Sequence, residues 1–191
     1  MMKRKKFPKL LKWDRITLKT TSLSFEQAEK DFHLMNKNRE FLLPRFDYME
    51  NMNIPENQFD NLSYAVGEVK KWNRGDYSIY LWKSYIWNIS VRINDPANKS
   101  CEMFYRLDSD YYRKWYMKEA LQLLEKEIFE NQDINRIFVQ MEKRNNNSIK
   151  FIESCGYICE WEWREVYYSN YFKDFWNMVY FSKLKSEYAK S

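Results

Sequence analysis

The sequence predicts a single mixed α/β domain, in which one sheet of about seven strands packs against helices. Its 191 residues lie within the usual range for one domain, and aromatic residues make up 19% of them, which is enough apolar material for a core. Strand-like and helix-like periodicities follow one another in the order β-α-α-α-β-β-β-α-β-α-β-β, and no repeat or Pro/Gly-rich linker divides the chain.

The first half of the chain is predicted to hold one strand and three helices. The alternation of DRITLKT, from Asp14 to Thr20, predicts the strand. Ser24 and Gln27 have the spacing of a capping box, and Pro55 suits the first turn of a later helix. The expected elements are a strand over 14–20, helices over 25–36, 39–49 and 55–72, and a turn over 73–76.

The second half is predicted to contain the rest of the sheet and two helices. Lys83-Ser84 is expected to turn a tight hairpin, and Gly156 is expected to close a short helix with positive φ. Apolar residues from Met117 to Phe129 recur at helical spacing. The expected elements are strands over 77–82, 85–93, 102–107, 134–141, 157–168 and 175–183, and helices over 116–131 and 148–155.

The positive charge of the chain is concentrated at its N-terminus. The formal net charge is +5, but residues 1–12 carry six Lys or Arg and no acid, which leaves 26 basic and 27 acidic groups in the remainder. We therefore divide the chain into a basic arm over 1–12 and a domain over 13–188. A nearly neutral body attracts phosphate weakly, so nucleic acid is not expected as a partner. No apolar run approaches the roughly 20 residues of a membrane span.

Metal and redox chemistry have few candidate residues. The chain has one histidine, His33, and three cysteines, Cys101, Cys155 and Cys159, whereas a structural zinc site takes four ligands. We therefore expect no metal site. The sparse, odd set of cysteines and the lack of a secretory pattern predict a cytoplasmic protein.

One strand–turn–helix passage has the character of an anion site. The predicted strand over 102–107 is followed by Tyr112-Arg113-Lys114, and then by the helix that begins at Tyr116. A helix N-terminus presents unpaired backbone N–H groups and a positive dipole end, which favour phosphate, and two cations reinforce that attraction. The alternative is an ordinary turn with solvated charges. With only 3 glycines in the chain, a glycine-rich phosphate loop of standard form is excluded.

Two blocks around this passage resemble the GNAT acetyltransferase superfamily, and within it the branch that acetylates the N-termini of ribosomal proteins. The first block is YRLDSDYYRKWYMKEALQLL, from Tyr105 to Leu124, and the second is INRIFVQMEKRNNNSIKFIESCGY, from Ile134 to Tyr157. Residues 36–44, 86–89 and 173–188 are similar to further segments of that branch, so the likeness covers most of residues 14–188.

The resemblance implies a single-domain GNAT fold, with a mixed, mostly antiparallel sheet whose fourth and fifth strands splay apart. Acetyl-CoA, the implied co-substrate, would lie between these strands, with its pyrophosphate on the backbone amides that open the following helix. The cofactor-binding residues implied by this likeness are Leu107, Tyr112, Arg113, Lys114, Trp115, Tyr116, Met117, Asn145 and Ser148.

The implied reaction transfers an acetyl group from acetyl-CoA to a primary amine, which attacks the thioester directly in a ternary complex. Glu102 matches a carboxylate of some members and is the candidate base, acting through water; the alternative is a solvent-facing strand residue. Ser148 is the candidate partner of the CoA sulfur; the alternative is that it only caps its helix. Ile152 stands where many members carry a tyrosine acid. A protein N-terminus is among the expected acceptors, and a homodimer is a further expectation.

The chain departs from this family at four positions where glycine is usual, which carry Trp87, Phe104, Arg113 and Trp115. A side chain at position 115 penalises positive φ and takes up room beside the pyrophosphate. The indole would either fill that site or point outward from a loop with negative φ. The first outcome favours an alternative function, a catalytically degenerate GNAT fold that acts as a protein-interaction module. The second favours an active enzyme from a glycine-poor composition.

Aromatic residues are frequent on the predicted strand over 157–168. Trp161 and Trp163 share one face of it, and Tyr167 and Tyr168 follow. By resemblance to the family this region borders the acceptor channel, while the alternatives are core packing and a dimer contact. A third possible role uses the basic arm to guide the enzyme to RNA or to a ribosome-bound substrate.

Overall fold

The computed structural model describes residues 5–70 and 74–189 of the chain. Within these ranges eight strands form one sheet in the order β1-β2-β3-β4-β5-β6-β8-β7, in which only β5 and β6 are parallel. The strands are β1 (Leu10–Lys12), β2 (Ile16–Thr20), β3 (Arg74–Leu81), β4 (Ser84–Asp95), β5 (Ser100–Leu107), β6 (Arg136–Glu142), β7 (Ile158–Ser169) and β8 (Asp174–Leu184).

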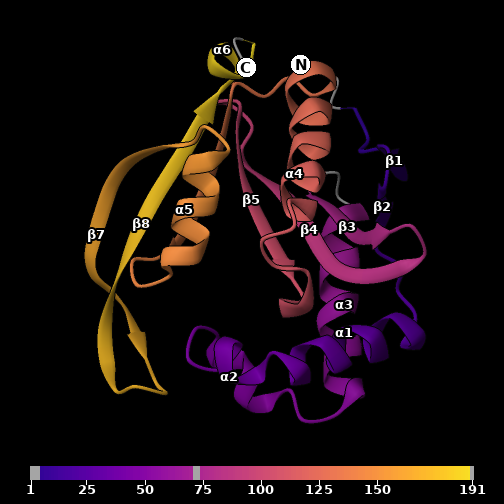
Figure 1. Ribbon diagram of the computed structural model, residues 1–191, viewed down its shortest axis with the longest axis vertical. Coiled ribbons are helices and arrows are strands. Elements are labelled where there is room, and N and C mark those ends of the chain that lie inside the picture. The colour runs from indigo at the N-terminus through magenta and orange to yellow at the C-terminus, as the bar shows by residue number, and fades with distance from the viewer. Residues whose placement is uncertain (1–4, 71–73, 190–191) are drawn as a thin grey trace.

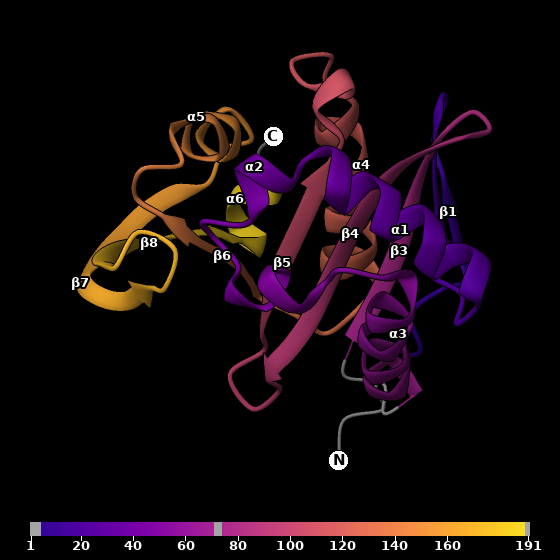
Figure 2. The ribbon, with the colours of Figure 1, turned by 90° about the horizontal axis from the view of Figure 1, so that it is seen from below.

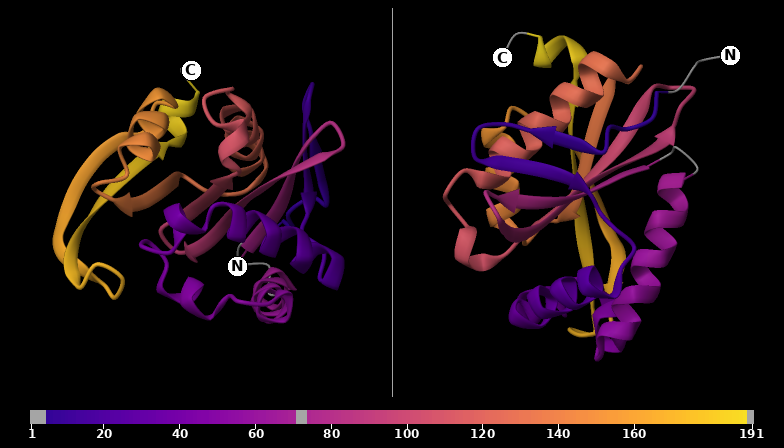
Figure 3. Two further views of the ribbon diagram at one scale, coloured as in Figure 1. Left: turned by 60° about the horizontal axis from the view of Figure 1, so that its bottom comes forward. Right: turned by 90° about the vertical axis from the view of Figure 1, so that its right-hand side faces the viewer.

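Helices cover both faces of the sheet, as Figures 2 and 3 show. One face carries α1, α2 and α3 together with the 3₁₀ turn η1, and the other carries α4 and α5. The helices are α1 (Phe25–Lys37), α2 (Arg39–Leu42), α3 (Pro55–Lys70), α4 (Tyr116–Lys126), α5 (Asn146–Ser154) and α6 (Lys185–Tyr188), and η1 spans Asp47–Asn51.

Strands β5 and β6 separate after a short parallel contact, and β5 lies apart from the β7–β8 pair in Figure 1. Their pairing is limited to Ser100–Glu102 against Arg136–Phe138. Beyond this point β5 continues to Leu107 beside β4, and β6 continues to Glu142 beside β8. The predicted splay is therefore confirmed. The strands that the sequence counts as fourth and fifth are β5 and β6, because β1 is an additional first strand.

The hydrophobic core has two parts. The larger part lies between the sheet and the α4–α5 layer and includes fully buried side chains such as Ile79, Leu121 and Ile137. The smaller part lies between β4 and the α1–η1 segment, where Trp87 packs against a cluster of methionines and leucines. The branched and aromatic residues of the strands thus supply both faces of the sheet.

The structure corrects several predicted boundaries. The helix expected over 39–49 is wrong as one element, because Pro44 has no N–H to continue a helix and α2 ends at Leu42. The hairpin turns at Trp82-Lys83 rather than Lys83-Ser84. The turn expected over 73–76 is wrong from Arg74 onward, since Arg74–Asp76 already belong to β3. Residues 71–73, which include the expected end of the third helix, lie outside the described residues.

The N-terminal residues also pack on the domain. Leu10–Lys12 of the expected basic arm pair with β2 as strand β1. The hydroxyl of Tyr77 donates a hydrogen bond to the Pro8 carbonyl at 2.9 Å, and the Phe7 ring packs against the larger core. A Cβ added at Gly75 would lie 3.1 Å from Phe7, so this glycine allows the close approach.

Candidate active site

The loop that joins β5 to α4 ends in left-handed backbone. Arg113 has φ of 58° and Trp115, the N-cap residue of α4, has φ of 65°. The N–H of Glu119 donates to the Trp115 carbonyl at 3.1 Å, as the first hydrogen bond of the helix. Within the described residues, the six backbone N–H groups from Arg113 to Lys118 donate to no protein acceptor, whereas Tyr112 N–H donates to Ser109. This row of donors stands at the positive end of α4 and is suited to an anion.

Most side chains around these amides are exposed to solvent or already have contacts of their own. The Trp115 indole is 60% exposed and has the Lys118 ammonium 5.1 Å from its ring centroid. The Lys114 ammonium donates to the Asp110 carbonyl at 2.9 Å. Met117 is buried in the core, and the Tyr116 ring packs under the Arg15 guanidinium. The loop therefore offers its backbone to a ligand more than its side chains.

The expectation for Trp115 needs correction. The indole is 60% exposed, and the φ of the residue is positive, whereas the second alternative expects a negative φ. Trp87, with φ of 119°, and Arg113 likewise keep a backbone conformation that favours glycine. Left-handed or similar backbone at a residue with a Cβ costs about 1–3 kcal/mol. At three of the four positions where glycine is usual, the chain thus keeps a backbone conformation that favours glycine, at a cost in stability.

We expect the double variant Arg113→Gly/Trp115→Gly to be more stable than the wild type by about 1 kcal/mol, because relief of strain exceeds the entropy cost of two glycines. Its dissociation constant for acetyl-CoA should change by less than about tenfold, since the amides already adopt this geometry. Urea unfolding and calorimetric titration measure the two quantities. Lys173→Gly, at φ of 53° between β7 and β8, is the control for strain relief away from the loop. A gain of about 100-fold in affinity would instead indicate that the two side chains obstruct the site.

Glu102 lies where β5 and β6 part. It is 1% exposed and accepts hydrogen bonds from Arg92 at 3.0 Å, Asn94 at 3.0 Å and Gln140 at 2.6 Å. The predicted alternative of a solvent-facing residue is therefore wrong. Its carboxylate links β4 to β6 across the first residues of the splay. Three donors occupy three of the roughly four acceptor positions of this carboxylate, so one position remains to take a proton from an amine, directly or through an intervening water.

Ser148 lies in the first turn of α5, on the opposite face of the sheet. Asn145 is the cap of this helix, and its Oδ1 accepts from the Ser148 N–H at 3.3 Å, so the alternative that Ser148 serves as the cap is wrong. The side chain of Tyr105 reaches this turn from β5, with its ring 5.4 Å from that of Phe151. Its hydroxyl is buried, faces Ser148 and makes no well-formed hydrogen bond. Burial raises the pKa of Tyr105 above its ordinary value, further from neutral pH.

The predicted site residues divide between the two faces of the sheet. Leu107, at the end of β5, packs with Tyr105 on the α4–α5 side, together with Ser148 and the loop amides. Glu102 faces the α1–α2 side, because successive residues of a strand alternate between faces. The splay lies between the two groups. Tyr105 has no role predicted from the sequence. The alternation of β5 is the signal that could have placed it on the face opposite Glu102.

An aromatic group shares the face of Glu102. Tyr180 of β8 lies between Trp161 and Trp163 of β7, at ring distances of 5.6 and 4.8 Å. Burial and the charge of Glu102 raise the pKa of Tyr180, which indicates that the two are neighbours. The two tryptophans are 49% and 48% exposed, so core packing, one of the predicted alternatives, is wrong for them.

The sequence profile of the acetyltransferase (GNAT) domain matches residues 48–158, more than half of the chain. The chain belongs to the GNAT acetyltransferase family. Membership of this family makes the chain an acyltransferase with acetyl-CoA as its co-substrate and an amine as its class of acceptor, as the resemblance predicts. No curated protein matches its sequence.

Solved structures share the fold of this acetyltransferase. RimL, a ribosomal L7/L12 α-N-protein acetyltransferase in complex with CoA, superposes with a TM-score of 0.84 at 16% identity, over 93% of this chain and 99% of its own. The microcin C7 self-immunity acetyltransferase MccE, in complex with acetyl-CoA and AMP, gives 0.81 at 20% identity over 90% and 93%. The ribosomal-protein-S5-alanine acetyltransferase of Vibrio fischeri gives 0.79 at 20% identity over 94% and 98%.

The described residues of the acetyltransferase contain neither a cluster of metal ligands nor a membrane-spanning helix. Over the described part of the chain, no group of three or more His, Cys, Asp or Glu side chains is arranged to hold a metal ion. No helix in residues 5–70 and 74–189 is both long and apolar enough to cross a membrane.

Proposed function

We propose that this acetyltransferase moves the acetyl group of acetyl-CoA to a primary amine by direct attack in a ternary complex, and that a protein N-terminus is the acceptor. The observation that carries the proposal is the row of six unengaged N–H groups from Arg113 to Lys118, at the positive end of α4 and beside the diverging strands. These amides would bind the pyrophosphate. The unpaired edges of β5 and β6 would bind the pantetheine as an added strand.

The reaction assigns one task to each face of the sheet. The amine nitrogen attacks the thioester carbonyl carbon, and the C–S bond breaks as the tetrahedral intermediate collapses. Glu102, on the acceptor face, would take a proton from the attacking amine through a water molecule. Ser148, on the cofactor face, would donate a hydrogen bond to the departing sulfur. Of the predicted cofactor residues, Tyr116 and Met117 would bind through their backbone N–H groups, and Tyr112 through its place just before this row of amides. Asn145 would position Ser148 by capping α5.

The acceptor class is supported by the face that carries Glu102. Trp161 and Trp163 present half-exposed rings beside Tyr180, which gives an ammonium-bearing chain aromatic surface near the proposed base. Two of the structurally similar enzymes act on ribosomal proteins, according to their names. The expected homodimer is supported by the exposure of β7, which ends the sheet.

We expect acetyl-CoA at 100 times its dissociation constant to stabilise the folded protein by about 2.7 kcal/mol. For a domain of this size, each kcal/mol raises Tm by about 2–4 °C. Thermal unfolding monitored by circular dichroism, with and without acetyl-CoA, measures the shift. Sodium chloride at the same ionic strength is the control for nonspecific salt effects. If millimolar acetyl-CoA leaves Tm unchanged, the transferase function is refuted and the interaction-module alternative is favoured.

A further inference from the structure

The junction between α1 and α2 contacts two segments that are far apart in the sequence. Its three residues are Lys37, Asn38 and Arg39. The first two contact the start of the β5–α4 loop, at residues 108–110, and the third contacts the turn over 49–53. The junction therefore joins the loop that would hold acetyl-CoA to a segment on the acceptor face.

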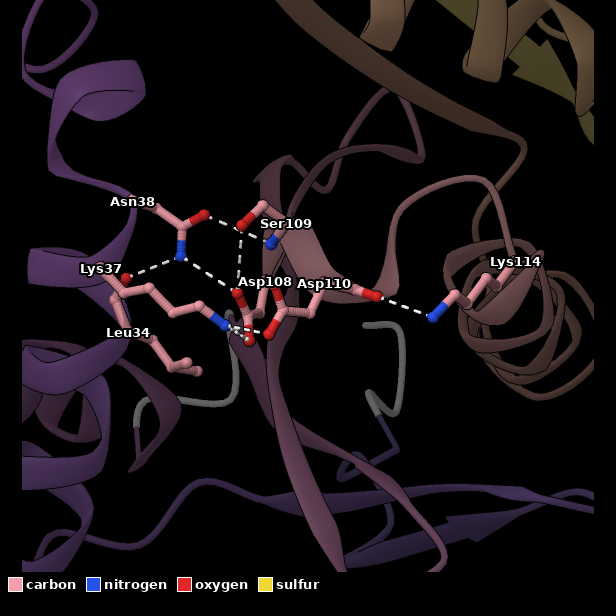
Figure 4. Close-up of polar contacts among 7 residues, drawn as sticks. All are labelled: Leu34, Lys37, Asn38, Asp108, Ser109, Asp110 and Lys114. Atoms are coloured by element: carbon pink, nitrogen blue, oxygen red, sulfur yellow. Dashed lines mark hydrogen bonds and ion pairs between the residues drawn. The ribbon is translucent and has the colours of Figure 1, made fainter.

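Lys37 and Asn38 fix the start of the β5–α4 loop (Figure 4). The Lys37 ammonium lies 2.8 Å from a carboxylate oxygen of Asp108 and 2.5 Å from one of Asp110. The Asn38 amide donates to Asp108 at 3.4 Å, and its oxygen accepts from the Ser109 N–H at 3.3 Å. One ammonium and one carboxamide thus hold three consecutive loop residues.

The charge state of this contact is stable around neutral pH. Burial raises the pKa of Asp108, but the hydrogen bonds from Lys37 and Asn38 outweigh it, so the carboxyl titrates below its ordinary value. The two carboxylates raise the pKa of Lys37. A lowered acid pKa gives stability that is lost only as pH falls through it, and a raised base pKa gives stability that is lost only at high pH. The ion pair therefore persists between these limits.

The loop is closed on itself just beyond this contact. The carbonyl of Asp110, one of the two residues that Lys37 holds, accepts from the Lys114 ammonium at 2.9 Å. Lys114 is followed directly by Trp115, the N-cap of α4. The Lys37 contact is thus connected, through Asp110 and Lys114, to the unengaged amides of residues 113–118.

Arg39 fixes the other segment. Its guanidinium donates to the carbonyls of Met49 at 3.0 Å and Met52 at 2.9 Å, and to the side chain of Asn53 at 3.1 Å. The neighbouring Tyr48 accepts a hydrogen bond from Arg106 of β5, which shares a face with Glu102. The turn over 49–53 is therefore tied to the face on which the acceptor would dock.

We propose that Lys37 is a positioning residue that holds the acetyl-CoA loop, and that the Lys37–Arg39 junction couples occupation of that loop to the order of residues 49–53. The inference rests on the proposed function, because it assigns acetyl-CoA to the loop. A ligand that orders residues 108–118 acts on Lys37 and Asn38, and through the adjacent Arg39 on the turn carbonyls. Coupling of this kind between two sites is typically worth a factor of about 5–150 in affinity.

Hydrogen exchange with CoA as the probe tests the coupling without an acceptor. In the wild type, CoA is expected to slow exchange in residues 112–118 and also at Met49 and Met52, whose N–H groups donate to the carbonyls of Phe46 and Met49. In Lys37→Met, the dissociation constant for CoA should rise about tenfold. At saturating CoA the variant should keep protection over 112–118 and lose it at 49–52. In the acetyltransferase assay, KM for acetyl-CoA should rise more than kcat falls.

Lys30→Met is the matched control, because Lys30 lies on the same helix and pairs only with the exposed Glu26 among the described residues. It should bind CoA and protect residues 49–52 as the wild type does. Asp110→Asn, which leaves Lys37 paired with buried Asp108, should give an intermediate loss, and Lys37→Arg should restore part of the affinity. Wild-type protein that binds CoA without protection at 49–52, or Lys37→Met with unchanged affinity and protection, would overturn the inference. Failure of the wild type to bind CoA would overturn the proposed function itself.

Discussion

Glu102→Gln is expected to lower kcat by a factor of about 10²–10⁴, the usual contribution of a positioned base. The dissociation constant for acetyl-CoA should change little, since Glu102 lies on the face opposite the β5–α4 loop. The amide keeps the shape of the side chain but cannot take a proton from the attacking amine. A steady-state assay with a peptide N-terminus as acceptor, together with calorimetric titration of acetyl-CoA, separates the two effects.

The same substitution also weakens the contacts of Glu102 with Arg92 and Gln140, so a control for structural damage is needed. Arg92→Met removes the ion pair and leaves the carboxylate in place. Both variants should have a free energy of unfolding lower by about 1–3 kcal/mol, because a hydrogen bond to a charged group is lost. They should therefore unfold at a lower urea concentration. Only Glu102→Gln should lose the chemical step. Equal losses of kcat in the two variants would indicate that Glu102 acts only as a structural link between β4 and β6.

Lys183→Met is expected to destabilise the fold by about 3–5 kcal/mol, the usual cost of leaving one member of a buried ion pair alone. Lys183 on β8 is 5% exposed, and its ammonium lies 3.2 Å from Glu125 of α4, which is 1% exposed. It also donates to the Cys155 carbonyl at 3.0 Å, at the end of α5. One side chain thus joins both helices of this layer to the far half of the sheet. Urea unfolding at pH 7 measures the loss.

The double variant Lys183→Met/Glu125→Leu is the control for this prediction, and it should recover most of the lost stability because no charge remains buried. Burial raises the pKa of Glu125 even in the native protein. In Lys183→Met, Glu125 therefore binds a proton more tightly in the folded state than in the unfolded state. The loss in free energy of unfolding should then become smaller as pH falls from 7 toward 4.5. A deficit that is independent of pH and persists in the double variant would point to lost packing instead.

The course of the chain could be predicted well where periodicity and local chemistry agree. The strands of the central hairpin and the long helix at Met117 follow directly from alternation and helical spacing. Gly156 has the positive φ expected of a residue that closes a helix. Pro44 could have divided the helix expected over 39–49, since its missing N–H is visible in the sequence.

The contacts within the site could be predicted only in part. The alternation of β5 separates Glu102 from Tyr105, but nothing local indicates that Glu102 is buried under three donors from other strands. The ion pair of Lys37 with Asp108 joins residues 71 positions apart, and such a pairing arises only from the packing of α1 against the end of β5. The prediction of negative φ at Trp115 is wrong for a different reason. The sequence favours negative φ there, and the requirements of the loop override this local preference.

The short parallel contact between β5 and β6 has a mechanical consequence. Within the described residues, three residue pairs and two hydrogen bonds to the Lys99 carbonyl form the backbone contact between the five-stranded half of the sheet and the three-stranded half. A pantetheine chain lying along both open edges would continue that ladder and stiffen the hinge between the halves. The bound co-substrate would then supply backbone-like pairing that the protein alone lacks at this place. The sheet would therefore reach its full rigidity only in the complex with acetyl-CoA.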